Sequence, residues 1–253
     1  MRRANALRPN DRLLRSALVA AVIGQGRSDE AFALAQENVR LFPREPLVHY
    51  GLAGGYTRLR RFDEALASYD AALAIQPFAS AFLYKTTLLA GWKGYLAAAR
   101  DALGQVLPED RAEDRAVGVA MWLGLLERDP ARVQAAAALT ARTYFEDSVV
   151  PGAKAWFPAL AWHADGKAAL ARQQWQAAEA ALRQRRREHP DVASDQARLA
   201  ITLVWLDRAD EAAREIAPFE AAAREQPSPD AAALLAQYHA SRGDAAKAVP
   251  YLR

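Results

Sequence analysis

Apolar side chains recur three and four residues apart along most of this chain, a spacing that gathers them on one face of an α-helix. Prolines interrupt the pattern regularly: Pro9, Pro43 and Pro77 each follow a helical stretch and are separated by 34 residues. Proline ends a helix because it lacks the amide hydrogen that the next backbone hydrogen bond needs. The alternation with a period of two that marks a half-buried strand is not found. The pattern predicts about seven antiparallel helix hairpins and no strands.

Small and large residues recur at fixed positions within this period. Twelve residues before Pro43 and Pro77 lie Ala31 and Ala65, each preceded by Asp-Glu, and Tyr69 lies eight residues before Pro77. Two antiparallel helices approach closely only where their side chains are small, and a large side chain beside the crossing fills the remaining space. A 34-residue period of this kind is typical of arrays of helix pairs that stack on one another.

The clearest unit covers residues 46–79. Six of its residues stand at signature positions of a known repeat: Leu52, Tyr56, Ala65, Tyr69, Ala72 and Pro77. On these residues the chain resembles the tetratricopeptide repeat (TPR) family, in the form of a bacterial-type helical repeat array. Arg60 stands where the family usually has a glycine between its two helices. The resemblance implies an all-α fold, an α-solenoid in which about seven antiparallel hairpins wind into a right-handed superhelix.

The same register divides the whole chain. Residues 1–11 read as the end of an incomplete upstream repeat, 12–109 as TPR-like repeats 1–3, 110–151 as a divergent helical hairpin and loop, and 152–253 as further TPR-like repeats. In the divergent part we expect helices at residues 111–127 and 131–145, followed by a loop at 148–152. Beyond it, Trp175 is expected to begin a second helix, and the last repeat looks cut short.

The two ends suggest that the chain is a piece of a longer array or of a multidomain protein. Residues 2–9 look like the last turns of a helix whose partner is missing, and the helix opened by Asp244 has little room before Arg253. Repeat arrays normally finish with polar capping elements, and neither end shows one. Natural, frayed ends are the alternative, and self-association is also left open because uncapped ends can stack.

Composition agrees with an all-helical, soluble chain. Alanine is the commonest residue and far outnumbers Val, Ile and Thr together. Alanine loses no side-chain entropy in a helix, whereas β-branched residues lose rotamer freedom there. The net charge of +3 is small and acidic residues are spread along the chain, so direct binding of nucleic acid is not expected. No apolar run reaches the roughly 18 residues of a membrane span.

The side chains that carry chemistry are sparse. The sequence has no cysteine, which removes disulfides, thiolate catalysis and Cys-based metal sites. Four histidines are present, at positions far apart and without metal-ligand spacing: His49, His163, His189 and His239. Neither a nucleophile elbow nor a phosphate-binding loop occurs. We therefore expect no enzyme activity, no catalytic residue, no metal and no cofactor.

In TPR proteins the first helix of each pair lines a concave groove that receives partners. Carried onto the first three units, this position implies a groove that includes the following residues: Leu13, Ser16, Ala20, Ile23, Leu47, Tyr50, Gly54, Thr57, Arg58, Ala81, Tyr84, Lys85, Leu88 and Trp92. Aromatic and arginine side chains are typical anchors of protein interfaces. The family's clamp for the two carboxylates of chaperone tails requires basic and Asn residues of which only Lys85 is present, so that role is argued against.

The sequence thus predicts a non-catalytic scaffold for protein–protein interaction, which binds a peptide or helical segment in the groove of a TPR array. Two alternatives remain. One is a sensor or effector arm of a larger bacterial regulator, such as a transcription regulator, cyclase or kinase. The other is an exported envelope assembly factor, because Arg2, Arg3 and the apolar residues 17–23 loosely resemble a secretory signal. A cytoplasmic location is expected, with periplasmic export the lesser alternative.

Overall fold

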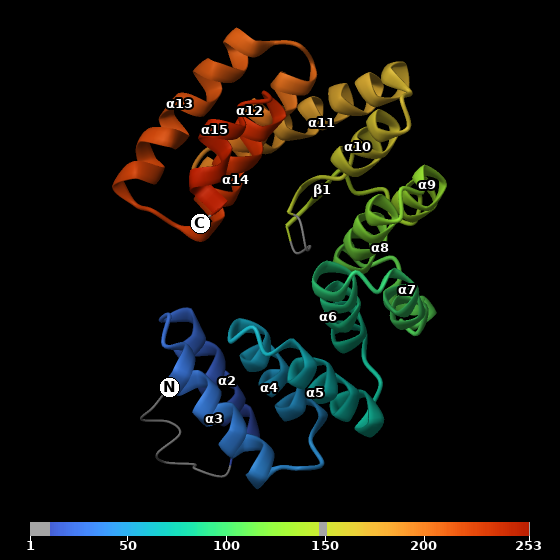
Figure 1. The fold of residues 1–253 in the computed structure, drawn as a ribbon, viewed down its shortest axis with the longest axis vertical. Helices are drawn as coiled ribbons and strands as arrows, with labels where there is room; N and C mark the ends of the chain where they lie inside the picture. Colours follow the sequence, from blue (N-terminus) through green and yellow to red (C-terminus); the bar gives the residue numbers. More distant parts are fainter. Residues whose placement is uncertain (1–10, 147–150, 253) are drawn as a thin grey trace. The chain divides into compact units, whose positions relative to one another are not determined.

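The structure, a computed structural model, describes residues 11–146 and 151–252. In that part of the chain fourteen α-helices follow one another as seven antiparallel pairs (Figure 1). The chain divides into two compact units at Arg111 and Ala112, two residues beyond the boundary expected at 109. The expected end of an upstream helix at residues 1–11 falls almost wholly outside the described residues.

The first unit holds three helix pairs. Their bounds are α2 (Arg12–Gly24), α3 (Ser28–Leu41), α4 (Pro46–Arg58), α5 (Phe62–Ile75), α6 (Ala79–Leu88) and α7 (Leu96–Gly104). Helix α6 continues as a short π-helix, η1 (Leu89–Lys93), and a 3₁₀ turn, η2 (Pro108–Asp110), follows α7.

The second unit holds four helix pairs and one short β-hairpin. Their bounds are α8 (Asp114–Leu126), α9 (Pro130–Ala137), β1 (Tyr144–Phe145), β2 (Gly152–Ala153), α10 (Trp156–Ala164), α11 (Ala168–Glu188), α12 (Ala193–Trp205), α13 (Ala209–Glu225), α14 (Pro229–Ser241), α15 (Ala245–Ala248) and the 3₁₀ turn η3 (Val249–Leu252). Trp175 therefore lies two turns inside α11 and does not begin it, which corrects the sequence expectation.

One residue in the left-handed conformation joins the two helices of every pair. These seven residues have φ angles between 55° and 74°: Gly26, Arg60, Gly94, Arg128, Gly166, Asp207 and Gly243. The first four are spaced 34 residues apart. In most of these turns the next amide donates to a carbonyl five residues back, as Arg61 does to Tyr56 at 2.9 Å and Asp129 to Gly124 at 2.9 Å. This Schellman motif satisfies carbonyls that the helix end would leave bare.

The left-handed turn makes Arg128 a site where a substitution should stabilise the protein. A Cβ in this conformation costs about 1–2 kcal/mol, while the extra backbone freedom of glycine in the unfolded chain costs about 0.5–1 kcal/mol. Arg128→Gly should therefore raise the melting temperature by about 1–4 °C, measured by circular dichroism. A fall in melting temperature would contradict the strain that we assign to this turn. Gly166→Ala, at the equivalent turn, should lower it.

Small residues pack where the helices cross, as the repeat pattern predicts. In the first unit Ala53, Ala65 and Ala81 are each 0 % exposed and lie beside Tyr69 in one core cluster. In the second unit the largest cluster is built around Trp156 and other buried side chains of α10 to α14. Gly124 on α8 is a further close approach, since a Cβ there would lie 2.9 Å from the Val133 side chain of α9. The helix pairs therefore interlock through small residues at defined positions.

The expected second helix at 131–145 is wrong, because α9 ends at Ala137. Tyr144–Phe145 instead pairs antiparallel with Gly152–Ala153. Extended backbone points successive side chains to opposite sides, so Phe145 enters the core formed with α8, α9 and α10, while Tyr144 packs on the cluster of α10 to α14. The two contacts explain why this segment leaves the helix. Of the expected loop at 148–152, residues 148–150 lie outside the described residues.

The last pair ends in a short second helix. Helix α15 has only four residues and passes into the 3₁₀ turn η3. The ring of Tyr251 in this turn stacks on His239 of α14, with centroids 5.8 Å apart. His239 is 6 % exposed, so it packs in the interior.

Candidate protein-binding surface of the first unit

A row of aromatic rings links α4 to α6 in the first unit. The ring of Tyr50 lies 5.5 Å from that of Phe78 and 5.8 Å from that of Tyr84, measured between centroids. Tyr84 also stacks on Tyr69 at 6.5 Å. Burial raises the pKa of the Tyr69 phenol well above its ordinary value, so this ring stays neutral at physiological pH. Tyr84 is 42 % exposed and forms the outer end of a fixed aromatic cluster.

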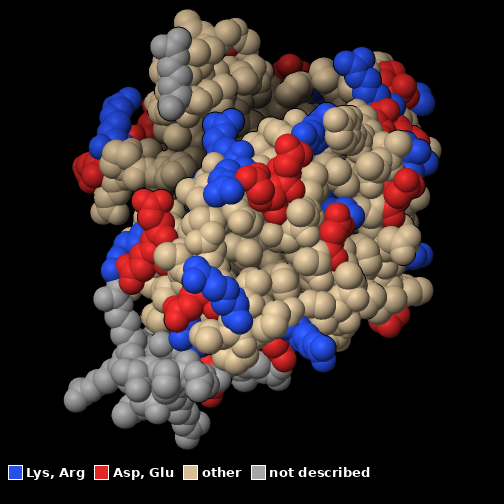
Figure 2. All heavy atoms as spheres, turned by 60° about the horizontal axis from the view of Figure 1, so that its bottom comes forward, with Lys and Arg blue, Asp and Glu red and all other residues tan. Residues whose placement is uncertain are grey.

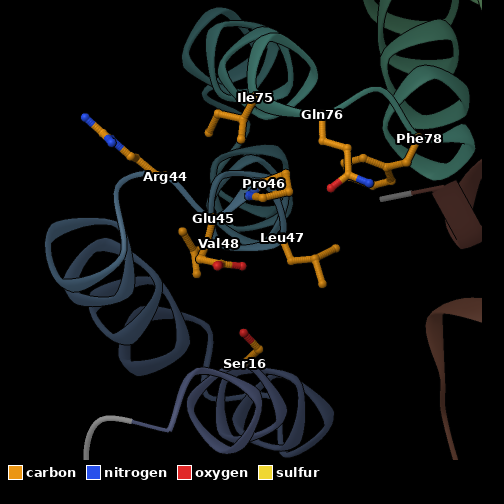
Figure 3. A pocket seen from close by; sticks show the side chains of 9 residues that line it. All are labelled: Ser16, Arg44, Glu45, Pro46, Leu47, Val48, Ile75, Gln76 and Phe78. Carbon is orange, nitrogen blue, oxygen red and sulfur yellow. The ribbon is translucent and has the colours of Figure 1, made fainter.

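An open pocket of about 470 Å³ adjoins this cluster where α4 begins. It is lined by Ser16, Arg44, Glu45, Pro46, Leu47, Val48, Ile75, Gln76 and Phe78. In Figure 3, Ser16 faces this pocket from α2 while Arg44 points away from the other labelled side chains. Leu47 and Ile75 are 51 % and 41 % exposed, which leaves two aliphatic side chains beside the pocket in contact with solvent. The pocket can take an apolar side chain of a partner.

The two basic groups expected in the groove differ in their surroundings. The ammonium group of Lys85 forms an ion pair with Asp70 of α5, so its charge is already matched. Arg58, the last residue of α4, is exposed, and within the described part of the chain its side chain has no hydrogen bond or ion pair. A guanidinium group without a partner can donate hydrogen bonds to a partner's carboxylate without first breaking an ion pair within the chain. Arg58 is therefore better placed than Lys85 to receive an acidic group.

Trp92 lies in the π-helix η1, at the other end of α6 from the pocket. Its indole packs on Phe62 of α5 with ring centroids 4.5 Å apart, and it is 40 % exposed. The ammonium group of Lys93 sits 3.8 Å from the indole centroid and 2.9 Å from a carboxylate oxygen of Asp63. These contacts hold the indole in one orientation at the surface.

Leu88 and Ala81 do not face solvent, which corrects their expected places in the groove. They are 7 % and 0 % exposed and belong to one core cluster with Ala53 and Ala65. Leu88 follows Tyr84 by four residues, and four residues carry a side chain roughly 40° past a full turn of the helix. That rotation is enough to bring Leu88 under the neighbouring helix while Tyr84 stays outside.

A buried polar network in the second unit was missed in the sequence. Asp195 of α12 is 0 % exposed and accepts hydrogen bonds from the hydroxyl of Tyr144, from Arg185 at 3.3 Å and from Arg198 at 3.0 Å. Arg185 also binds Glu146 at 2.6 Å. Asp195 and its partners are up to 51 residues apart in the sequence, so no local sequence pattern could have predicted the network. The network fastens the β-hairpin to α11 and α12.

Charges elsewhere on the surface are mixed. Figure 2 shows one face on which many of the Lys and Arg side chains lie beside Asp or Glu, without a continuous basic stripe. Among the described residues no group of three or more His, Asp or Glu side chains could hold a metal ion. No helix in residues 11–146 or 151–252 combines the length and the hydropathy needed to cross a membrane.

Seven helix pairs, joined by the same left-handed turn and packed through small residues, define an all-α protein of TPR-like repeats. Solved structures confirm this fold. A tetratricopeptide repeat protein from Parabacteroides merdae matches with a TM-score of 0.59 and 15 % identity, over 95 % of this chain and 90 % of its own. Pseudomonas aeruginosa PilF matches with a TM-score of 0.60 and 16 % identity, over 92 % and 97 %.

A thermophilic TPR protein from Thermus thermophilus is also similar in structure. Its TM-score is 0.52 at 20 % identity, and the match covers 77 % of this chain and all of its own. No protein-family model matches the chain, and no curated protein matches it in sequence. At these identities the likeness establishes the fold, and the function has to be argued from the surface.

Proposed function

We propose that this chain is a non-catalytic scaffold for protein–protein interaction, and that its first unit binds a peptide or helical segment of a partner. The segment would lie along the face of α4 and α6 that carries Tyr50 and Tyr84, with an apolar side chain in the pocket beside Leu47. The TPR-like fold supports the general role, because stacked helix pairs leave an extended surface for recognition.

The observation that carries this proposal is the exposure of large apolar side chains along α4, α6 and η1. Leu47, Tyr84 and Trp92 are 51 %, 42 % and 40 % exposed, although their neighbours are packed. Tyr84 and Trp92 are also held in place by ring contacts at 5.8 Å and 4.5 Å. Side chains that are already ordered lose little entropy on binding, so they suit the role of interface anchors.

A cytoplasmic location is part of this proposal. The apolar stretch at residues 17–23, which resembles a secretory signal, lies within α2. Leu18, Val19 and Val22 are 7 %, 7 % and 2 % exposed and pack in one core with α3 and α4. Cleavage after about residue 26 would remove this helix and expose the core of the first unit, which speaks against export.

Site-specific photo-crosslinking in cells tests the binding face. A benzophenone side chain placed at Tyr84 or at Leu47 should give the same partner adduct. The matched control is Leu170 of α11, which is 41 % exposed and lies in the other unit. It should give no such adduct.

If these side chains are anchors, removing the aromatic ring of Tyr84 should strongly reduce the adduct. With the crosslinker at Leu47, Tyr84→Ala should reduce the adduct at least tenfold, because losing an aromatic anchor costs about 2 kcal/mol of binding energy. The melting temperature should change by less than a few degrees, since the side chain is partly exposed. Equal yields of the adduct from positions 47, 84 and 170 would contradict the proposed binding face.

A further inference from the structure

The edge of the first unit at which α4 turns into α5 carries two arginines without partners. Arg58 ends α4 and Arg60 lies in the turn, and both side chains are exposed. Among the residues that the structure describes, neither guanidinium group has a hydrogen bond or an ion pair. Their neighbours differ in this respect, because Arg61 is paired with Glu64 at 2.8 Å and Lys93 with Asp63 at 2.9 Å.

Two exposed aromatic rings lie at the same edge. Trp92 is 40 % exposed and touches Phe62, the residue two places after Arg60, at 4.5 Å between centroids. Tyr95, three residues further along the chain, is 55 % exposed. The ammonium group of Lys93 lies 3.8 Å from the Trp92 ring and 6.0 Å from the Tyr95 ring, which ties both rings to one place. The edge therefore combines free arginines with ordered aromatic rings.

Arg60 stands at this edge at a cost in backbone strain. Its φ is 56°, in the conformation that glycine adopts in the turns before and after it, at Gly26 and Gly94. Glycine would fit the turn without the clash that a Cβ brings. Arg128 shares this strain, so the strain by itself does not distinguish Arg60; what sets Arg60 apart is the pair of exposed aromatic rings at its edge.

The two arginines without partners set the sign of what this edge would bind. Residues 11–111 contain 12 Lys and Arg against 11 Asp and Glu, so this part of the chain is nearly neutral as a whole. The positive charge is local to the edge. Guanidinium groups pair with carboxylates through two parallel hydrogen bonds, and aromatic faces add apolar contact beside them.

We propose that Arg58, Arg60, Trp92 and Tyr95 form a second anchor, which binds an acidic segment of a partner protein. The inference rests on the proposed function, since it places this anchor at the far end of the same face. Arg58 follows Leu47 by 11 residues along α4, so the anchor lies roughly 17 Å from the pocket at Leu47. The partner would carry its carboxylates about 11 helical residues, or about five extended ones, from its apolar side chain.

An anionic membrane is the other surface that arginine and tryptophan can meet. It is the weaker candidate, because each basic residue strengthens binding to anionic lipid only about fivefold and two are free here. Two arginines that meet two fixed carboxylates gain specific geometry that a fluid lipid surface does not offer.

Fluorescence anisotropy with the full chain tests the anchor directly. The probe is a fluorescein-labelled peptide, Glu-Glu-Leu-Phe-Glu-Glu, and the control peptide has lysine in place of each glutamate. The chain should bind the acidic peptide at least tenfold more tightly than the control. The double variant Arg58→Ala, Arg60→Gly should weaken binding at least tenfold and flatten its dependence on salt, and Trp92→Ala should weaken it about fivefold.

Arg128→Gly provides the matched control, because Arg128 is exposed and occupies the same left-handed turn in the second unit, with φ of 55°. Arg60→Gly alone and Arg128→Gly alone should each raise the melting temperature by about 1–4 °C. Only Arg60→Gly should weaken peptide binding, by at least threefold. A variant that is more stable yet binds less tightly cannot owe its loss to poor folding.

Peptide binding within twofold of the unchanged chain in the double variant would overturn the anchor. Vesicles of equal parts phosphatidylcholine and phosphatidylserine that bind the chain through Arg58 and Arg60, while the peptide does not, would overturn it in favour of a membrane. Either result can stand beside intact crosslinks at Tyr84 and Leu47, in which case the proposed function survives and only the acidic anchor is lost.

Discussion

Asp195→Ala should destabilise the second unit by about 3–5 kcal/mol, because it removes one partner of a buried set of charges. The carboxylate is 0 % exposed, and the guanidinium groups of Arg185 and Arg198 that it pairs with are 15 % and 12 % exposed. Without it, Arg198 loses its ion pair and Arg185 keeps only Glu146. Two poorly solvated positive groups would then face each other.

Urea unfolding followed by circular dichroism measures this loss. The control is Asp191→Ala, since that residue is exposed and lies in the turn just before α12. This control should change the free energy of unfolding by less than about 0.5 kcal/mol, the usual range for surface sites. An effect of Asp195→Ala below about 1 kcal/mol would show that water reaches the two arginines.

The same network has a dependence on high pH. Burial, and next the hydrogen bond that it donates to Asp195, raise the pKa of Tyr144 to about 12. The unfolded chain would lose this proton near the ordinary value of 10. The stability that the protonated phenol contributes is therefore complete below pH 10 and is lost as the pH rises towards 12.

Phe145→Ala should cost about 3–5 kcal/mol as well, for a different reason. The ring is 0 % exposed and fills the core between α8, α9 and α10, so its removal leaves a cavity that the helices cannot close fully. Phe145→Leu should cost about 1.5 kcal/mol or less, because most of the volume is kept.

Chemical denaturation of the second unit checks this prediction, with Leu139→Ala as the control. Leu139 is 50 % exposed and lies shortly before the strand, so its loss should be almost neutral. If Phe145→Ala matched the control, the β-hairpin would have no part in holding the core together.

The helix pairs could be predicted because their signals are local. The period is indicated by Pro43, Pro77 and the alanines before them, and it predicts the number of helix pairs. The left-handed turn can be recognised directly only where glycine occupies it. Arg128 stands one period after Gly94, so counting onward from that glycine leads to its turn, whereas Asp207 follows Gly166 at a longer spacing that the period does not reach.

The β-hairpin and the state of the candidate groove could not be predicted. Strands of two residues are too short to show any alternation, and Tyr144–Phe145 is extended only because each ring packs on a different core. The ion pair between Lys85 and Asp70 joins residues on different helices, and the inward turn of Leu88 depends on the helix beside it. Burial of this kind is a property of packed helices, which spacing alone does not contain.

Arrays of repeats usually obey a simple rule of cooperativity, in which each unit couples only to its nearest neighbours and stability is close to a sum of local terms. The segment Tyr144–Phe145 departs from that rule, because its two rings pack in different clusters. The hydroxyl of Tyr144 also donates a hydrogen bond to Asp195 on α12. Melting of α8 and α9 therefore pulls Phe145 from its core and loosens Tyr144 from the helices beyond. The second unit should melt as one block, whereas the first, which has no such crossing segment among its described residues, is free to fray pair by pair.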